Sequence, residues 1–164
     1  MVSFTDSAEA EALAERAHEL MEEVVLPKER ELEGGMSVSQ GTIDDLRESA
    51  REYGVYAPHI DEEYGGMGYE FRDVLPTFEE AGRSILGALA MNIAAPNEGN
   101  MHLLQLHGSE LQKEEYLKPL VAGEISSGFS MTEPIQGGGS DPKMLKTTAE
   151  KDGDEWVIDG HKWW

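Results

Sequence analysis

The sequence predicts an α+β protein, in which an all-α helical bundle is followed by the first strands of a β-domain. As far as Gly123, apolar residues recur at spacings of three and four, which is the period of amphipathic helices. Beyond Gly123 the pattern changes to short alternating runs bounded by turn residues, which is typical of β-strands. We therefore expect a helical domain over 1–125 and the opening of a β-domain, itself incomplete, over 126–164.

The first expected helix runs from Asp6 to about Glu31. Asp6 is a suitable N-cap, and Glu9 three residues later completes a capping-box pattern. Pro27 is expected to kink this helix or to end its regular part, because its ring nitrogen cannot donate a hydrogen bond. The expected buried face consists of Ala10, Leu13, Ala17, Leu20, Met21, Val24 and Val25.

A second helix is expected after the glycine-containing loop 33–41. Thr42 is its predicted N-cap, and Gly54 is its predicted stop signal. Its apolar face contains Ile43, Leu46, Ala50 and Tyr53.

Further helical patterns follow a glycine-rich loop at 56–69. Ser109 and Gln112 form a second capping box at the start of the last of these helices. Each helix is short and amphipathic, so the helices must share one core, in which we expect Met91 and Met101 to pack. The expected spans are 72–82, 85–94, 98–106 and 109–122.

Short strands are expected over Ser127–Thr132 and Thr147–Glu150. The turn Lys151–Asp154 leads into the alternating run Trp156–Ile158, and this pattern predicts a β-hairpin that ends in a second turn at Asp159–Gly160. Two or three strands with an unpaired edge make a poor independent domain. We therefore expect the remainder of this β-domain to lie outside the 164 residues.

The composition excludes several classes of protein. The net charge of −20, from 33 acidic and 13 basic residues, argues against nucleic-acid binding because no basic stripe is present. The absence of cysteine excludes disulfides, thiolate metal sites and thiol catalysis. No signal peptide and no apolar run of the ~20 residues that a membrane span needs are present, so a soluble, cytoplasmic protein is expected. A halophilic source and an ordinary acidic protein both remain open as explanations of the charge.

No metal-binding or acid–base group is predicted from side-chain spacing. His102 and His107 are five residues apart, unlike the i, i+4 spacing that places two imidazoles on one helix face. Acidic clusters such as Glu22-Glu23 are expected to be solvated helix faces. No nucleophile–base pair is evident, so we assign no catalytic residue and no metal ligand.

The segment Phe129–Asp141 combines an expected strand with a glycine-rich loop. It reads Phe-Ser-Met-Thr-Glu-Pro-Ile-Gln-Gly-Gly-Gly-Ser-Asp. Glycines leave backbone N–H groups unobstructed, which suits the close approach of an anion or a ring system. On these residues alone, a flexible surface turn is the alternative interpretation.

This segment resembles the flavin-contacting strand of the acyl-CoA dehydrogenase family. In that family a threonine hydroxyl and neighbouring backbone groups hydrogen-bond the flavin ring, and the resemblance assigns these contacts to Phe129, Met131 and Thr132. The Gly-Ser-Asp ending also resembles the family's motif, and this resemblance implies a position for Ser140 near the acyl-CoA substrate and the pyrophosphate of the flavin. The chain carries one more glycine before this serine than the family's usual spacing.

The segment Val157–Trp164 resembles a second flavin motif of the same family, Asn-Gly-x-Lys-x-Trp. Trp164 matches the tryptophan that packs against the flavin, and Asp159 stands where asparagine is commoner. For Trp156 and Trp163 we expect apolar packing on a strand.

The resemblance extends upstream over essentially the whole chain. Glu63–Gly68 resembles the family's Glu-Tyr-Gly-Gly-x-Gly loop, and Gly108–Lys113 resembles its helix before the β-domain. Ala95–Met101 is similar to a segment of one subgroup, the large eukaryotic members fused to kinase-like domains and their bacterial relatives.

The resemblance implies the α,β-dehydrogenation of an acyl-CoA thioester in fatty acid β-oxidation, with FAD as cofactor. It also implies electron-transfer flavoprotein as a partner, a homotetramer or homodimer, and a barrel-like middle β-domain of which 126–164 is the start. The family's glutamate base lies in a C-terminal helical domain beyond residue 164, so Glu133 is not assigned as the base. We expect this truncated chain to be inactive alone.

Two sets of alternatives remain open at this point. A non-catalytic helical module or remnant that associates with another chain is the alternative to an enzyme. Within the family, oxidases and flavin monooxygenases share the fold, and the residues present do not specify the length or branching of the acyl chain.

Overall fold

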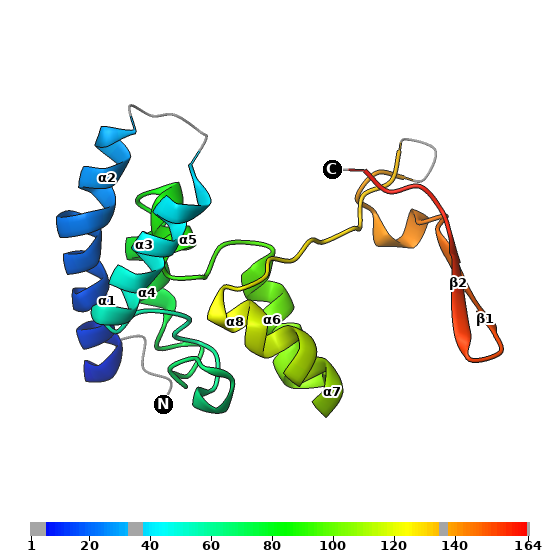
Figure 1. Cartoon of the computed structure of the whole chain (residues 1–164), viewed down its shortest axis with the longest axis horizontal. Helices are drawn as coiled ribbons and strands as arrows, with labels where there is room; N and C mark the ends of the chain where they lie inside the picture. Colours follow the sequence, from blue (N-terminus) through cyan, green and yellow to red (C-terminus); the bar gives the residue numbers. More distant parts are fainter. Residues whose placement is uncertain (1–5, 33–37, 135–137, 164) are drawn as a thin grey trace. The chain divides into compact units, whose positions relative to one another are not determined.

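The structure, a computed structural model, describes residues 6–32, 38–134 and 138–163. The chain divides into two compact units, Met1–Ser127 and Gly128–Trp164. The first unit is helical and the second contains a two-stranded antiparallel sheet (Figure 1). The predicted α+β class, a helical bundle followed by the first strands of a β-domain, is confirmed.

Helix α1 (Ala8–Leu20) is capped by Ser7 rather than by Asp6. The Ser7 hydroxyl accepts a hydrogen bond from the Ala10 N–H at 3.0 Å and donates one to Asp73 Oδ1 at 2.8 Å. The capping box predicted for Asp6 and Glu9 is therefore wrong by one residue, because the serine hydroxyl satisfies the free N–H of the first turn.

A π-helical turn, η1 (Met21–Val25), joins α1 to α2 (Leu26–Glu31). Pro27, whose ring nitrogen has no N–H to donate, lies in the first turn of α2, directly after the π-helical turn. The regular α-helix is thus interrupted before Pro27, as predicted, while the helical winding continues to Glu31.

Helix α3 (Gln40–Glu52) begins earlier than predicted, because Ser39 caps it in place of Thr42. The Ser39 hydroxyl accepts the Thr42 N–H at 3.1 Å. The predicted stop at Gly54 is confirmed, since this glycine adopts a positive φ of 65° directly after the helix.

The capping box at Ser109 is confirmed. The Ser109 hydroxyl accepts the Gln112 N–H at 3.3 Å, and Gln112 Oε1 accepts the Ser109 N–H at 2.9 Å. The remaining helical elements are α4 (Leu75–Ala81), α5 (Ile85–Ala90), α6 (Asn97–His107), α7 (Glu110–Gln112), the π-helical turn η3 (Lys113–Leu117), α8 (Lys118–Ala122) and the short 3₁₀ turns η2 (Glu62–Tyr64) and η5 (Pro142–Met144).

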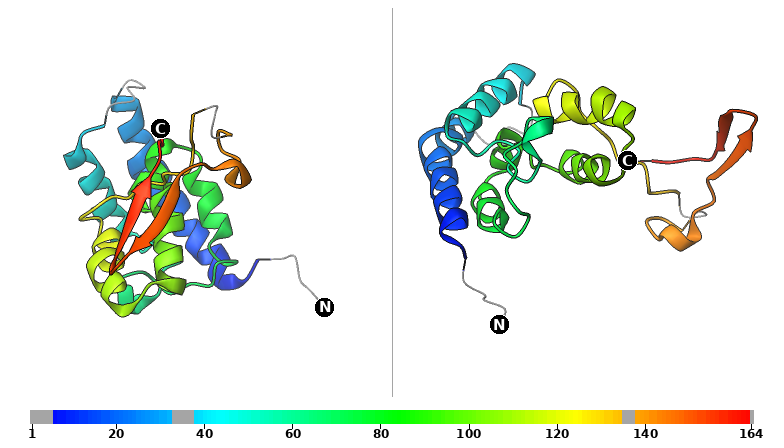
Figure 2. Two further views of the ribbon diagram at one scale, coloured as in Figure 1. Left: turned by 90° about the vertical axis from the view of Figure 1, so that its right-hand side faces the viewer. Right: turned by 90° about the horizontal axis from the view of Figure 1, so that it is seen from below.

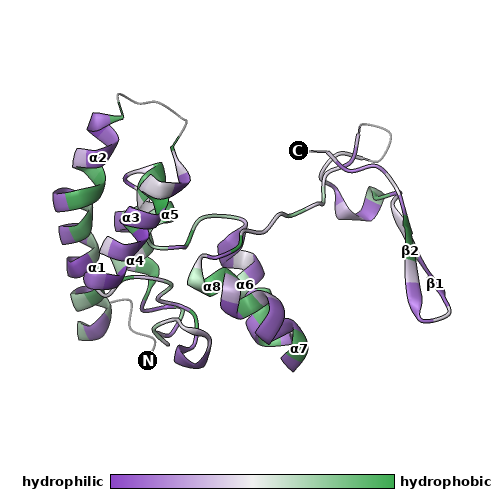
Figure 3. Cartoon of the chain, in the orientation of Figure 1, coloured by the Kyte–Doolittle hydropathy of each residue, from purple (hydrophilic) through white to green (hydrophobic). Residues whose placement is uncertain are grey.

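The helical unit has one shared core, as the short amphipathic helices predict. Helix α1 packs against α4, α3 against α5, and α6 against η3 and α8. Purple and green bands along these helices in Figure 3 mark their polar and apolar sides. Met91 and Met101 are fully buried, which confirms their predicted place. Other large side chains of this core are Leu13, Leu20, Met21, Ile60, Leu117 and Leu120.

Gly87 allows α5 to approach η1 closely. A Cβ atom at this position would lie 2.4 Å from the Ala81 carbonyl oxygen and 2.7 Å from Met21 Sδ. Any side chain here would clash with the backbone at the end of α4, so α5 would have to shift. None of the described helices combines the length and apolar character that crossing a membrane requires.

The predicted hairpin is confirmed as β1 (Thr148–Asp152) and β2 (Glu155–Asp159) (Figure 2). The strands pair antiparallel, with Asp152 opposite Glu155, and Gly153 supplies the positive φ of the turn, 61°. All residues of both strands are exposed. Trp156 is 64% exposed, so the packing predicted for it is not found. The reason is that no second layer covers the hairpin within the described part of the chain.

The strand predicted over Ser127–Thr132 is not formed. These residues have no ladder of backbone hydrogen bonds to another described strand. A strand requires a ladder of backbone bonds to a partner strand, and the bond from the Trp163 N–H to the Thr132 carbonyl oxygen at 3.1 Å does not extend into such a ladder among the described residues.

Candidate functional site

Glu133 is the centre of the second unit. Its side chain is buried, and the residue is 2% exposed. The carboxylate accepts hydrogen bonds from the Lys146 N–H at 2.8 Å, the Thr147 N–H at 2.9 Å and Lys162 Nζ at 3.0 Å. The Glu133 N–H donates to the Gly139 carbonyl oxygen at 2.9 Å. One residue thus joins the glycine-rich loop, the segment before β1 and the segment after β2.

These donors keep Glu133 ionised. Thr147, the Lys146 N–H and the Lys162 ammonium lower the pKa of Glu133 to about 2, against the opposing effect of burial. A carboxylate with such a pKa is a poor proton acceptor at neutral pH. The hydrogen bonds of Glu133 therefore fit a structural role, and we do not assign this residue as a catalytic base.

The two motifs singled out in the sequence lie side by side within this unit. The Trp163 N–H donates to the Thr132 carbonyl oxygen at 3.1 Å, and Lys162 Nζ donates to the Met131 carbonyl oxygen at 3.0 Å. The two segments are about thirty residues apart in the chain. The Thr132 side chain is half-buried, and its hydroxyl has no hydrogen-bond partner among the described residues. That hydroxyl is therefore available to a ligand.

The other predicted site residues differ in their exposure. Phe129 is 67% exposed, Met131 is half-buried and Ser140 is exposed. Trp164 lies outside the described residues, as does Gly137 in the glycine-rich loop. The flavin and substrate contacts expected of Phe129, Met131, Thr132, Ser140 and Trp164 stay predictions.

The glycine-rich loop suits a ligand that needs close access to the backbone. Gly138 has a φ of 82°, and a Cβ there would lie 2.3 Å from Met144 Cβ, so glycine is required. Gly139 has a φ of 65°, and nothing lies within 4 Å of the position of its Cβ. The bare backbone at Gly139, the available Thr132 hydroxyl and the exposed Phe129 ring are compatible with a flavin, whose ring needs polar groups and an apolar face.

Lys162 is a site residue to which the sequence analysis assigned no role. Its ammonium binds both Glu133 and the Met131 carbonyl oxygen, and this position makes it the link between the two motifs. The sequence contained one signal for this pairing: Lys162 and Glu133 carry opposite charges, and each lies in one of the two motifs. Their pairing could not be derived without the fold.

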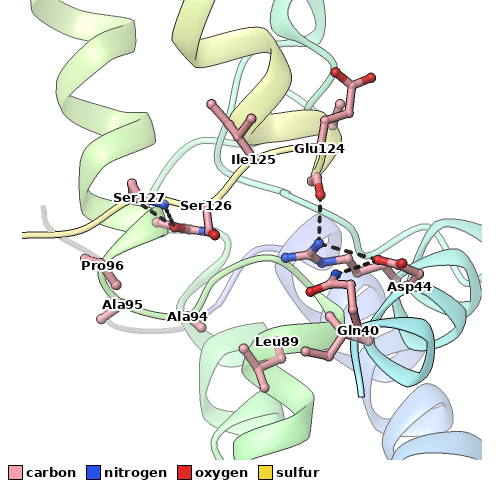
Figure 4. Close-up of a pocket in the computed structure, with 15 residues that line it drawn as sticks. Gln40, Asp44, Leu89, Ala94, Ala95, Pro96, Glu124, Ile125, Ser126 and Ser127 are labelled. Carbon is pink, nitrogen blue, oxygen red and sulfur yellow. Dashed lines mark hydrogen bonds and ion pairs between the residues drawn. The ribbon is translucent and has the colours of Figure 1, made fainter. Parts of the chain in front are cut away.

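The helical unit contains a cavity of about 600 Å³, shown in Figure 4. It lies between α3, the connection from α5 to α6, and the chain after α8. Arg47 is its buried cationic residue, with Nη1 donating to the Gly123 carbonyl oxygen at 3.0 Å. The wall is completed by Gln40, Ile43, Asp44, Leu89, Ala94, Ala95, Pro96, Asn97, Ala122, Glu124, Ile125, Ser126 and Ser127.

Residues 7–124 match the family model described as "Acyl-CoA dehydrogenase, N-terminal domain". The chain belongs to the acyl-CoA dehydrogenase family. It is 38% identical over 123 residues to a probable acyl-CoA dehydrogenase, FadE2, of Mycobacterium tuberculosis, an alignment that covers 74% of the chain. It is 31% identical over 170 residues, 98% of the chain, to acyl-CoA dehydrogenase family member 11 of Mus musculus.

A solved structure of a putative acyl-CoA dehydrogenase from Mycobacterium abscessus superposes with a TM-score of 0.83 at 35% identity, over 98% of the chain. The chain spans only part of each of these proteins: 29% of the M. tuberculosis protein, 21% of the mouse protein and 43% of the M. abscessus chain. The family is thus shown by the match of residues 7–124 and by relatives of which this chain covers a part.

Proposed function

We propose that this chain supplies the N-terminal helical domain and one flavin-contacting edge of an FAD-dependent acyl-CoA dehydrogenase. In this proposal residues 1–125 form the helical domain and 126–164 begin the middle β-domain. Membership of the family supports the proposal. The observation that carries it is the hydrogen bond between Trp163 and Thr132, since it brings two segments that resemble flavin-contacting motifs to one place.

The roles proposed for the site residues follow from the groups that they present. The Thr132 hydroxyl and the backbone at Phe129 and Met131 would hold the flavin ring, and Trp164 would pack against it. Ser140 would lie near the flavin pyrophosphate and the acyl-CoA. When bound, FAD would accept the hydrogen that leaves the β-carbon as hydride. Acyl-CoA as substrate, electron-transfer flavoprotein as electron acceptor, a dimer or tetramer, and a cytoplasmic location belong to the same proposal.

Glu133 and Lys162 would act on the flavin edge indirectly. Because the Lys162 ammonium binds the Met131 carbonyl oxygen and the buried Glu133 carboxylate, it fixes the backbone on either side of Thr132. Neither residue is proposed to move a proton. By the family resemblance, the catalytic glutamate would belong to a C-terminal helical domain beyond residue 164, so these 164 residues alone are expected to be inactive.

A non-catalytic module is the second candidate, and a specific observation favours it. The helical unit has its own core, whereas both strands of the hairpin are exposed along their whole length. Such a hairpin can add to a sheet supplied by another polypeptide. In this case the chain would associate with a partner without contacting a flavin.

The test is FAD titration of the complete polypeptide that carries this sequence. We expect a yellow complex that oxidises acyl-CoA. We expect the Thr132→Val variant, which removes one hydroxyl at nearly constant volume, to bind FAD about tenfold more weakly, the equivalent of one hydrogen bond of roughly 1.4 kcal/mol. Ser130→Ala, on an exposed side chain two residues away, is the matched control. If the complete polypeptide binds no FAD, the proposal of an FAD-dependent enzyme is wrong and the non-catalytic module remains.

A further inference from the structure

The last residue of the helical unit is fastened to helix α6 by two asparagines. Asn97 Oδ1 accepts hydrogen bonds from the Ser127 N–H at 2.9 Å and from the Ser127 hydroxyl at 2.8 Å. The same hydroxyl accepts a hydrogen bond from Asn100 Nδ2 at 2.9 Å. All three side chains are half-buried, and Figure 4 shows dashed interactions ending at Ser127. We refer to Asn97, Asn100 and Ser127 as the asparagine clasp.

The chain entering the clasp is also held. Arg51 Nη2 donates to the Ala122 carbonyl oxygen at 2.8 Å, and Arg47 Nη1 donates to the Gly123 carbonyl oxygen at 3.0 Å. Both arginines lie on α3. The end of α8 is thus bound by α3, and Ser127, five residues after Ala122, is bound by α6 of the same unit. Gly123 itself has a φ of 81°, and a Cβ there would lie 2.9 Å from Arg47 Nη1.

Asn92 completes the attachment of α8. This buried residue donates from Nδ2 to the carbonyl oxygens of Leu120 at 3.1 Å and Val121 at 3.2 Å. The final carbonyls of a helix have no partner within the helix, so side chains that bind them fix the position of its end. Four successive carbonyls, from Leu120 to Gly123, are bound in this way, and the clasp follows directly.

We infer that Asn97 and Asn100 are positioning residues for the segment Phe129–Thr132. This inference rests on the function proposed above, in which that segment contacts the flavin. Ser127 lies two residues before Phe129 and five before Thr132. Because the clasp fixes both the backbone N–H and the side chain of Ser127, it sets the point on the helical unit from which the flavin-contacting segment departs.

The physical reason is conformational entropy. A segment whose first residues are already ordered loses less entropy when a ligand binds it than a segment that is free at both ends. The clasp supplies this order with three neutral hydrogen bonds. Its loss would therefore weaken FAD binding without removing any atom that touches the flavin.

The experiment compares three variants of the complete polypeptide. Asn97→Leu removes the acceptor of two hydrogen bonds at similar size, Asn97→Asp keeps an acceptor oxygen, and Ser126→Ala changes an exposed neighbour outside the clasp. Hydrogen exchange measured on peptides across residues 124–132 reports order without FAD. In Asn97→Leu we expect exchange at 127–132 to accelerate about tenfold, with Asn97→Asp close to the unmodified protein and Ser126→Ala unchanged.

FAD affinity provides the second reading. We expect the dissociation constant to rise about tenfold in Asn97→Leu, with an altered visible absorption spectrum of the bound flavin and an unchanged unfolding midpoint of the helices. Should Asn97→Leu fail to fold, a second pair of variants makes the same comparison. Ser127→Ala removes the hydroxyl of the clasp, whereas Ser127→Thr keeps it. Unchanged exchange at 128–132 in the variants that lose the clasp would overturn the inference. Absence of FAD binding by the unmodified protein would overturn the proposed function alone, because the exchange measurement would still decide the clasp.

Discussion

The two units of this chain are stabilised in different ways. The helical unit buries a continuous set of apolar side chains, among them Leu13, Leu20 and Met101, all without exposed surface. In the second unit both strands are exposed. Among the described residues of this unit, Glu133 is buried, and its charged carboxylate is held by a network of hydrogen bonds. The first unit is thus held by the hydrophobic effect, and the second by hydrogen bonds to a carboxylate. This difference predicts which changes will affect stability and which will affect only local order.

The largest expected effect comes from the helical core. Leu20→Ala removes a fully buried side chain and should lower the free energy of unfolding by about 2 to 5 kcal/mol. Trp156→Ala, in β2, removes a larger side chain that is 64% exposed, and should change it by no more than about 0.5 kcal/mol. Urea unfolding followed by helical circular dichroism measures both. A large loss of stability in the tryptophan variant would show that the hairpin is covered in solution.

His59 should make the helical unit sensitive to acid. Burial and, to a smaller extent, the neighbouring His102 together lower the pKa of His59 to about 4. Between pH 6.5 and 4 the unfolded chain therefore binds more protons than the folded chain, and stability falls as the pH falls. The loss should approach about 3 kcal/mol. In His59→Leu the part of this slope due to His59 should disappear, whatever the stability at pH 7. An equally steep slope in this variant would contradict the assignment.

Glu133→Gln tests the second unit. The amide cannot accept the same charged hydrogen bonds, so we expect faster hydrogen exchange at Lys146, Thr147 and Trp163, with unchanged exchange in α1. Acid should reproduce the effect. The pKa of Glu133 is lowered to about 2, so its contribution is complete above its usual range near 4.5 and is lost as the pH falls towards 2. Exchange resolved by residue, by nuclear magnetic resonance, makes the measurement, and Glu155→Gln on exposed β2 is the control.

The smallest effect is expected at an exposed ion pair. Lys28 and Glu31 are one helical turn apart on α2, with their charged atoms 3.1 Å apart, the Glu31 side chain exposed and the Lys28 side chain partly exposed. Such pairs contribute little because water competes for both charges. Glu31→Gln should change the free energy of unfolding by less than about 0.5 kcal/mol, and a larger change in low salt would mean that the pair belongs to a wider network.

The sequence predicted the helical unit well because its signals are local. Three- and four-residue spacings identified α1 and α3, and the capping box at Ser109 was correct to the residue. The caps at Asp6 and Thr42 were wrong because a serine stood nearby in each case, and only the geometry of the first turn decides between adjacent candidates. Periodicity locates a helix but does not fix its first residue.

The second unit was predicted less well because its structure depends on contacts between distant residues. The hairpin followed from the turn at Gly153, which is a local signal. The network of Glu133 with Lys162 joins positions 29 residues apart, and no spacing rule connects them. The strand expected over Ser127–Thr132 was wrong for the same reason, since a strand exists only where another backbone pairs with it. The clasp at Asn97 likewise joins α6 to a residue 30 positions later.

Native-state hydrogen exchange across both units, in one sample and resolved by residue, tests the central comparison most directly. We expect amides in the middle of α1, α3 and α6 to exchange only through global unfolding, and amides of β1 and β2 to exchange through local opening at much lower free energy. Glu133→Gln should accelerate exchange only in the second unit. Strand amides as strongly protected as those of α1, or a Glu133→Gln effect that extends into the helices, would contradict the account.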